Sequence, residues 1–156
     1  MEKASYQGLL VWQKAMNLTA VIYNLVKKLP KEELYSLSDQ MRRAVVSIPS
    51  NIAEGQDRNT NKEFAHFLCI ARGSKAELET QLLVCVKIGY LTEVEISEAM
   101  NLLTEVGKML TSLINKLKTE NSQLKTKNSQ LKTKNSQLKT ENSQLKTINS
   151  QLKTKN

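Results

Sequence analysis

Glycine, proline and aromatic residues are scarce in this 156-residue chain, which has five glycines, two prolines, one tryptophan, four tyrosines and two phenylalanines. Sheet proteins with many tight turns use more glycine and proline, so the composition favours an all-helical fold. No apolar run approaches the roughly 20 residues that a membrane-spanning helix needs. The first seven residues lack the charged-then-apolar layout of a signal peptide. We therefore expect a soluble, cytoplasmic protein with no membrane partner.

Residues that bind metals or attack substrates are equally sparse. The chain has one histidine, His66, and two cysteines, Cys69 and Cys85, which lie 16 positions apart. Zinc needs about four ligands, usually in close pairs, so we expect two buried free thiols and no metal. The chain also has no glycine-rich phosphate loop and no nucleophile with a matched base. We predict no catalytic residues, no cofactor and no small-molecule substrate.

The net charge of +8 is concentrated at one end of the chain. Residues 118–156 carry nine lysines and two glutamates, whereas residues 1–117 carry 14 basic and 13 acidic side chains. The high isoelectric point therefore describes the C-terminal segment, and it does not by itself make the rest of the chain a nucleic-acid-binding domain.

Four stretches carry apolar residues at helical spacing, which predicts an antiparallel up-and-down four-helix bundle over residues 1–118. The first runs over residues 9–29 and is stopped by Pro30. The second begins between residues 30 and 38. The third covers residues 61–88 after a Thr60–Glu63 capping box, and Gly89 closes it. The fourth follows a Thr92–Glu95 capping box and ends near residue 118.

The second helix contains Pro49 and reaches Gly55. Proline removes a backbone donor and crowds the preceding turn, so we expect a kink or break near residues 45–49. Gly55 is read as a left-handed residue that closes this helix.

The third helix has two apolar faces, and the second of them, with Ile70, Gly73, Val84 and Ile88, is a candidate contact with another subunit. Glu77 shares that face. Three roles are open for it: an edge carboxylate in solvent, a buried ion-pair partner, or a catalytic group. The candidate partners for an ion pair are Arg42 or Arg43 of the second helix, or Arg72 or Lys75 from a neighbour.

The C-terminal segment, residues 119–156, repeats Asn-Ser-Gln-Leu-Lys-Thr-x, with leucine every seven residues from Leu117 to Leu152. If leucine occupies heptad position d, asparagine occupies every position a, which weakens a coiled-coil seam. Three interpretations are open: a loosely helical or disordered solvated appendage, a marginal coiled coil that stabilises an oligomer, or a basic arm that contacts phosphates non-specifically.

Several motifs together resemble a known family. They are Trp12-Gln-Lys-Ala15, the segment Asp39–Gly55 with its Ser-Ile-Pro-Ser-Asn-Ile-Ala-Glu-Gly run, residues 71–83 with Ala-Arg-Gly-Ser, and Gly89-Tyr-Leu91. In these motifs, residues 8–117 resemble the bacterial four-helix-bundle proteins encoded in intervening sequences of 23S ribosomal RNA genes, also labelled S23 ribosomal proteins. The heptad segment lies outside the family pattern.

The resemblance implies a ring-like homopentamer and similarity to the accessory variability protein of diversity-generating retroelements, which works with a reverse transcriptase and nucleic acid. We therefore predict a non-enzymatic oligomeric bundle that binds RNA, DNA or a nucleoprotein partner. The alternative is a purely structural homo-oligomeric scaffold. Candidate nucleic-acid contacts are Arg42, Arg43, Arg58, Lys62, Arg72 and Lys75. Candidate structural and interface residues are Pro49, Asn51, Glu54, Gly55, Gly73 and Glu77.

Overall fold

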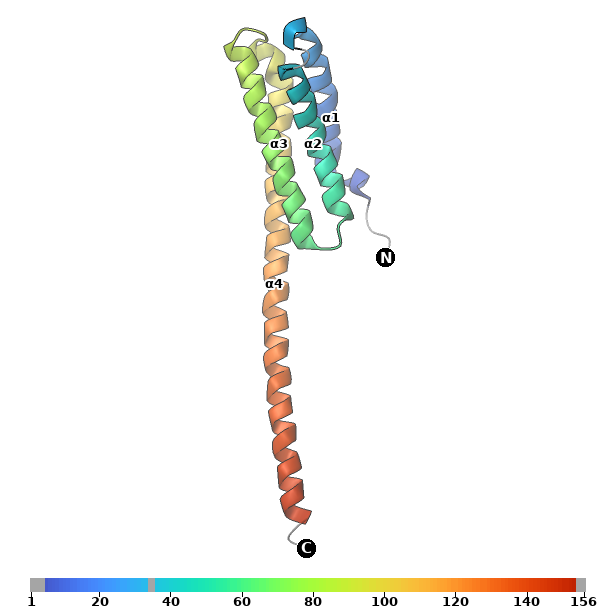
Figure 1. The fold of residues 1–156 in the computed structure, drawn as a ribbon, viewed down its shortest axis with the longest axis vertical. Helices are drawn as coiled ribbons and strands as arrows, with labels where there is room; N and C mark the ends of the chain where they lie inside the picture. Colours follow the sequence, from blue (N-terminus) through green and yellow to red (C-terminus); the bar gives the residue numbers. More distant parts are fainter. Residues whose placement is uncertain (1–4, 34–35, 154–156) are drawn as a thin grey trace. The chain divides into compact units, whose positions relative to one another are not determined.

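The computed structural model describes residues 5–33 and 36–153, and these residues are helical almost throughout, with no strand among them (Figure 1). This confirms the predicted all-helical class. None of the helices in this part of the chain has a stretch long and apolar enough to cross a membrane. The elements are η1 (Tyr6–Gly8), α1 (Leu10–Leu25), η2 (Val26–Lys28), η3 (Lys31–Glu33), α2 (Leu37–Asp57), α3 (Asn61–Lys87) and α4 (Glu93–Lys153).

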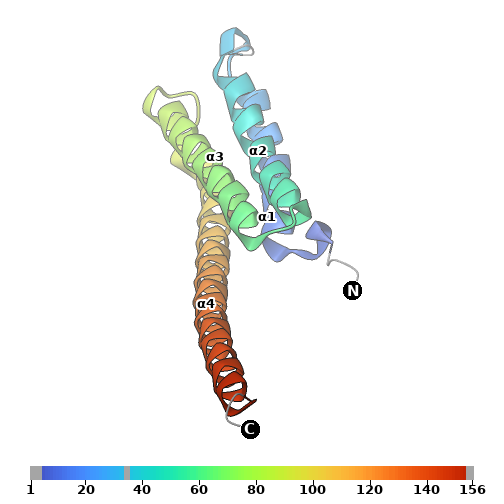
Figure 2. The same cartoon turned by 60° about the horizontal axis from the view of Figure 1, so that its bottom comes forward.

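By its internal contacts the chain divides into two units, Met1–Lys118 and Thr119–Asn156. The first unit is a bundle of α1, α2, α3 and the first part of α4. Helix α2 packs against both α1 and α3 (Figures 1 and 2). Two ion pairs reach α4 from the N-terminal part of the bundle: Nζ of Lys14 in α1 lies 2.7 Å from Glu105 Oε2, and Nζ of Lys28 in η2 lies 2.9 Å from Glu95 Oε1.

Each helix of the bundle buries one stripe of side chains at the spacing that its sequence predicts. Burial of each large aliphatic side chain contributes about 1.5–3 kcal/mol, which makes these stripes the main stabilising feature. The largest fully buried side chains are Leu18, Ile22, Met41, Val45, Ile48, Ile52, Leu68, Leu78, Leu82, Leu103, Leu110 and Ile114.

The contact between α2 and α3 is closest near the loop that joins them. A Cβ atom added to Gly55 would lie 2.7 Å from Phe67 Cβ and 2.9 Å from Phe64 Cδ2. Further along the two helices, Ser47 Oγ and Ser74 Oγ share a hydrogen bond of 2.9 Å. Glycine and serine therefore allow these two backbones to approach each other.

Thr60 and Thr92 both cap the helices that the sequence predicts after them, each with the glutamate three residues later. The backbone N–H of Glu63 donates to Thr60 Oγ1 (3.2 Å), and the Thr60 hydroxyl donates to Glu63 Oε2 (2.8 Å). At α4 the exchange is reciprocal, because Glu95 N–H donates to Thr92 Oγ1 (3.2 Å) and Thr92 N–H donates to Glu95 Oε2 (2.9 Å).

Gly89 ends α3 as predicted, and its φ of +82° is the left-handed conformation that glycine adopts without strain. The prediction for Gly55 was wrong. No residue other than Gly89 has a positive φ in the described part of the chain, and α2 continues past Gly55 to Asp57. Gly55 does not end the helix; it is required because Phe64 and Phe67 of α3 lie too close to its Cα for a side chain to fit.

Two other helix predictions need correction. Helix α2 passes through the buried Pro49 without a break, so of the two expected outcomes, a kink or a break, the break does not occur. Whether it kinks there stays a prediction. The fourth helix does not end near Lys118 but continues to Lys153, so the described part of the heptad segment is helical, and residues 154–156 lie outside the described chain.

Candidate docking groove between α1 and α2

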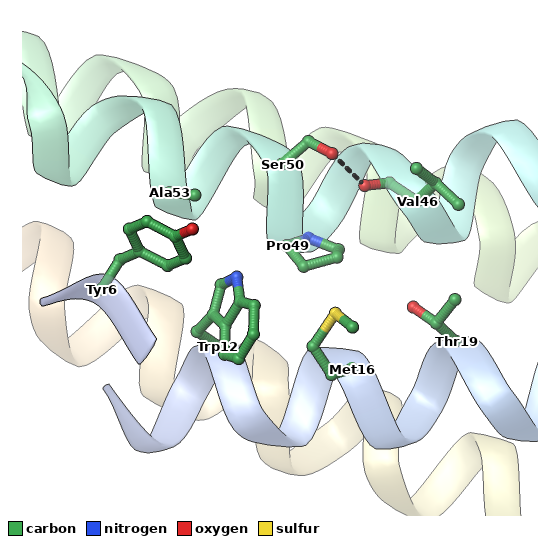
Figure 3. Close-up of a pocket in the computed structure, with 8 residues that line it drawn as sticks. All are labelled: Tyr6, Trp12, Met16, Thr19, Val46, Pro49, Ser50 and Ala53. Atoms are coloured by element: carbon green, nitrogen blue, oxygen red, sulfur yellow. Dashed lines mark hydrogen bonds between the residues drawn. The ribbon is translucent and has the colours of Figure 1, made fainter. Parts of the chain in front are cut away.

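An apolar groove of about 270 Å³ lies between α1 and α2 on the outside of the bundle (Figure 3). Helix α1 contributes one wall and α2 the other, and the η1 turn supplies a residue at one end. The lining residues are Tyr6, Trp12, Met16, Thr19, Val46, Pro49, Ser50 and Ala53.

The helical repeat explains why these side chains meet. On α1, Trp12, Met16 and Thr19 are spaced four and three residues apart, so they form a second stripe beside the buried one. On α2, Val46, Pro49 and Ala53 have the same kind of spacing and face that stripe (Figure 3). Two parallel stripes, each just outside the core, make an open channel.

Pro49 lies in the middle of the α2 wall (Figure 3). Its ring is buried, and it cannot donate a backbone hydrogen bond to the Val45 carbonyl. Two side chains next to it bond back to the helix: Ser50 Oγ donates to Val46 O (2.8 Å), and Asn51 Nδ2 donates to Ser47 O (2.7 Å). These bonds are local to the Ser-x-Pro-Ser-Asn run and go to the two carbonyls that follow Val45 in the chain, not to the Val45 carbonyl that lacks its Pro49 donor.

An aromatic pair closes one end of the groove. The rings of Tyr6 and Trp12 meet edge to face, with centroids 5.4 Å apart and an interplanar angle of 63°. Such pairs contribute about 0.5–1.5 kcal/mol beyond their buried area. The pair gives the groove a stiff apolar end, while Met16 is 43% exposed and Val46 is 41% exposed.

The other end of the groove becomes polar. Val46 also lines a second hollow of about 420 Å³, where it is joined by Tyr23, Asp39, Arg42, Arg43 and Ser47. Arg43 Nη1 lies 3.8 Å from Asp39 Oδ2, and both side chains are largely exposed. Arg42 is partly buried in this hollow. One continuous strip of α1 and α2 therefore has an apolar half and a cationic half.

The structure does not bring the six candidate nucleic-acid contacts together. Arg42 and Arg43 line the polar end of the groove. Arg58 lies at the far end of α2, where Nη2 donates to Glu54 Oε1 (2.6 Å) and the guanidinium stacks 5.0 Å from the Phe67 ring centre. The hollow beside Arg58 is lined mainly by acidic groups and is unsuited to phosphate: Glu54, Asp57, Arg58, Asn59 and Glu63.

The remaining three candidates lie on α3. Lys62 is exposed in its first turn, and Arg72 is exposed near its middle. Lys75 reaches across α4, since its Cε would lie 3.3 Å from a Cβ atom at Gly107, and its Nζ bonds Glu79 Oε2 at 2.6 Å. Gly107 thus leaves room for the Lys75 side chain. In Lys75, Arg43 and Arg58, the positive charge already has a carboxylate within 4 Å.

Among the candidate structural residues, Pro49 and Gly55 are buried, and Asn51 is partly buried with its amide donating to Ser47 of the same helix. Glu54 and Gly73 are exposed, and a Cβ atom at Gly73 would meet nothing within 4 Å. Glu77 is exposed and accepts a hydrogen bond from Gln81 Nε2 (3.1 Å). Within one chain Glu77 is therefore at the helix edge.

Cysteine and acidic side chains do not assemble a metal site in the described residues, where no group of three or more potential ligands gathers. Both cysteines are free; Cys85 is buried and Cys69 is only partly buried, so the expectation of two buried thiols holds for Cys85 alone. Burial raises the pKa of the Cys85 thiol above its usual value. That keeps the thiol protonated and unreactive.

The groove residues other than Tyr6 lie within the part of the chain that a family model matches. The model for the 23S rRNA-intervening sequence protein covers residues 7–112, which includes α1, α2, α3 and much of the bundle part of α4. The chain belongs to the 23S rRNA-intervening sequence protein family. The heptad segment lies beyond the residues that define this membership.

A solved structure from the same family has a similar fold. It is a protein of unknown function from the S23 ribosomal protein family of Bacteroides thetaiotaomicron, 29% identical in sequence, with a TM-score of 0.63. The similarity covers 67% of this chain and 98% of that one. No curated protein matches the chain. The family model and the solved structure therefore agree on the family and on an all-helical fold, and the solved relative is itself a protein of unknown function.

The sequence singles out Pro49, Arg42 and Arg43 within one segment, but it does not identify the groove that they line. Met16, Thr19, Tyr23 and Val46 were missed as surface residues. A signal was present, because Trp12, Met16, Thr19 and Tyr23 repeat at four, three and four residues on one side of the buried stripe. A repeat of this kind indicates a helix with more apolar surface than its core needs.

Proposed function

We propose that this family member is a non-enzymatic, homo-oligomeric scaffold in which α3 of one copy docks in the α1–α2 groove of the next. The groove carries the proposal: it is apolar, lined by the family's signature segments, and uncovered in the single chain. Isolated apolar side chains are common on protein surfaces, but a lined apolar channel with aromatic walls is typical of a binding surface.

A second uncovered apolar surface supplies the occupant. Ile70, Val84 and Ile88 lie along one edge of α3 and are 40%, 41% and 51% exposed. Glu77 lies on the same edge, one heptad from both Ile70 and Val84. We call these four residues the α3 ridge. They correspond to the second apolar face that the sequence predicted for subunit contact.

Ridge and groove also match in charge. The ridge carries one carboxylate, Glu77, among aliphatic side chains, and the groove has the cations Arg42 and Arg43 beyond its apolar half. Glu77 in a neighbouring groove would then meet a guanidinium, which compensates the loss of water around it. This supports the ion-pair role for Glu77 in the assembly, while the single chain leaves it exposed.

Because ridge and groove are different surfaces, each copy would offer one of each. Such head-to-tail contacts generate a closed ring when the rotation between copies closes. The ring-like homopentamer implied by the family resemblance fits this geometry. We favour a scaffolding role for the bundle over nucleic-acid binding, because the six candidate basic residues are dispersed and three of them are paired with carboxylates.

A charge exchange tests the proposal. Glu77→Arg and Arg42→Glu, each alone, should lower the oligomeric mass measured by light scattering, and the double variant should restore it. A matched control is Glu98→Arg, which reverses an exposed carboxylate on α4 away from both surfaces. Measuring each variant with and without residues 119–156 removes any contribution of the heptad segment. Single variants that keep the parent mass would contradict the proposal.

A further inference from the structure

The heptad segment exposes a regular stripe of leucines. Residues Thr119–Lys153 are the final part of α4, and the leucine side chains recur every seven residues on one face. Leu124, Leu131, Leu138 and Leu145 are 55%, 59%, 48% and 57% exposed. A lone helix gains little from such a stripe, because most helical stability in proteins comes from packing of the apolar face.

The opposite face of the same helix needs no partner. The threonines and several serines there donate back to the carbonyl four residues earlier, as Thr133 Oγ1 does to Ser129 O (3.1 Å) and Ser136 Oγ to Lys132 O (3.1 Å). These are heptad positions b and f when leucine is position d. The side chains for which a second helix would supply contacts are therefore those at positions a and d, asparagine and leucine.

The flanking charges discriminate between possible partners. Position e is lysine in every heptad: Lys125, Lys132, Lys139, Lys146 and Lys153. In an antiparallel pair of these segments, positions e face each other and every e contact is between two lysines. In a parallel pair, position g faces e of the next heptad, so Glu120 meets Lys125 and Glu141 meets Lys146 of the other copy. Parallel pairing also sets Lys127 against Lys132 and Lys134 against Lys139, so its g–e contacts are attractive in two heptads and repulsive in two. Antiparallel pairing has only repulsion at e, so the charges favour the parallel arrangement.

The asparagines favour the same arrangement. In a parallel, in-register pair, Asn121, Asn128, Asn135, Asn142 and Asn149 each face their own counterpart at position a. An amide has both a donor and an acceptor, so two facing amides can bond to each other. Asparagine at position a is the best attested device for fixing partner number and register in coiled coils, at a cost in stability. Because the asparagine recurs in five heptads, the segment should be selective for partner number and register, and each pair of segments should be only weakly stable.

From the exposed leucine stripe, the lysines at e and the asparagines at a, we propose that residues 119–153 form a parallel, in-register coiled coil with the same segment of a second copy. This surface is separate from the α1–α2 groove and does not rest on the scaffold proposed above. Its consequence is directional, because parallel pairing brings equivalent residues of two chains together.

Disulfide trapping in the full chain tests this arrangement. Asn142→Cys places a thiol at position a, and Thr140→Cys, two residues earlier, places one at the outward position f. Both are made with Cys69→Ser, because Cys85 is buried and Cys69 is only partly so. Under oxidised glutathione, we expect chains with Asn142→Cys to form disulfide-linked dimers at least tenfold faster than chains with Thr140→Cys. Equal rates would overturn the proposal.

A second variant tests the leucine seam. Leu131→Asn with Leu138→Asn, added to Asn142→Cys, should reduce cross-linking to the rate of Thr140→Cys. An undiminished rate would overturn the proposal that leucines hold the pair. The ratio of the two cysteine variants reports the orientation of the segment even when the bundle itself assembles, so failure here is distinct from failure of the groove contact. An antiparallel pair would separate the two Asn142 positions by about 18 Å at 1.5 Å per residue.

Discussion

Gly55 of α2 lies against Phe67 of α3 so closely that no side chain fits between them. A Cβ atom at residue 55 would be 2.7 Å from Phe67 Cβ, a separation that real Cβ atoms essentially never show. Phe64 Cδ2 would be only 2.9 Å away. Since Phe67 Cβ is fixed to its helix backbone, the conflict is relieved only by moving α2 and α3 apart.

Gly55→Ala should therefore destabilise the bundle. Overpacking in a well-packed site costs typically ~1–3 kcal/mol, and alanine recovers up to ~1 kcal/mol of helix propensity. We expect a net loss of about 1–2 kcal/mol in the free energy of unfolding, measured by urea titration followed by circular dichroism. An unchanged or increased stability would mean that the helices separate without loss.

Gly73→Ala is the matched control in α3. It also lies within a helix, but a Cβ atom there meets nothing within 4 Å. We expect this substitution to raise stability by about 0.5–1 kcal/mol, because alanine restricts the unfolded chain and suits a helix. Opposite signs for the two glycines would show that the close approach of α2 and α3, and not helix propensity, decides the effect at residue 55.

The contrast between the glycines also shows what the sequence can predict. Gly89 follows an apolar helix and precedes a capping box, so local pattern alone predicts its left-handed turn. Gly55 has similar local surroundings, followed by a polar loop, yet its role depends on Phe64 and Phe67 from the next helix. That contact is tertiary, and no feature of residues 50–60 encodes it.

The candidate groove divides in the same way. The segment 39–55 is conspicuous in the sequence, and the hydrogen bonds from its serine and asparagine side chains to the backbone four residues earlier are local and therefore predictable. The groove itself needs the placement of α1 beside α2, which pairs Met16 with Val46 and Pro49. Periodicity predicts which side of each helix is apolar, but it does not say which two helices leave a channel between them.

The pH dependence of stability should reveal the clamp at the start of α4. Hydrogen bonds from Lys28 and Thr92 lower the pKa of Glu95 from 4.5 to about 2. A carboxyl group with a lowered folded-state pKa stabilises the protein above its unfolded pKa, and this contribution is lost as pH falls toward the folded pKa. The stability advantage of the parent over Glu95→Gln should therefore be constant above pH 5 and disappear between about pH 4.5 and pH 2.

Thermal unfolding at pH 6, 4, 3 and 2 measures this difference. Glu98→Gln removes a carboxylate one turn further along α4 and controls for the change in net charge. A Lys28→Met variant should raise the pKa of Glu95 and shift the loss toward higher pH. An advantage of the parent that persisted unchanged to pH 2 would contradict the clamp.

Trp12 offers a direct optical readout of the groove, because it is the single tryptophan of the chain. Its ring is partly exposed in one copy and lies at the aromatic end of the groove. If α3 of another copy fills the groove, Trp12 leaves water on assembly. We expect dilution of the parent to red-shift its emission and increase quenching by acrylamide, whereas Glu77→Arg should show the red-shifted spectrum at every concentration. Identical, concentration-independent spectra would contradict occupation of the groove.

Nucleic-acid binding by the bundle stays a prediction, and salt dependence can test it. Each phosphate contact adds about one to the slope of log affinity against log salt. If Arg42 and Arg43 contact phosphates, replacing both by glutamine in a chain ending at Lys118 should reduce that slope by about 2 in filter-binding titrations with RNA.

Lys62→Gln with Arg72→Gln is the control for that experiment, since it removes two exposed charges outside the groove. The same loss of slope in the control would indicate diffuse attraction and no defined site. A third outcome is that the full chain binds RNA at low salt and the chain ending at Lys118 does not. All phosphate contact would then lie in residues 119–156, in the part of the chain where lysine is concentrated: residues 118–156 contain nine lysines and two glutamates. The groove would then serve protein contact alone, because its arginines would be free to meet Glu77 of a neighbouring copy.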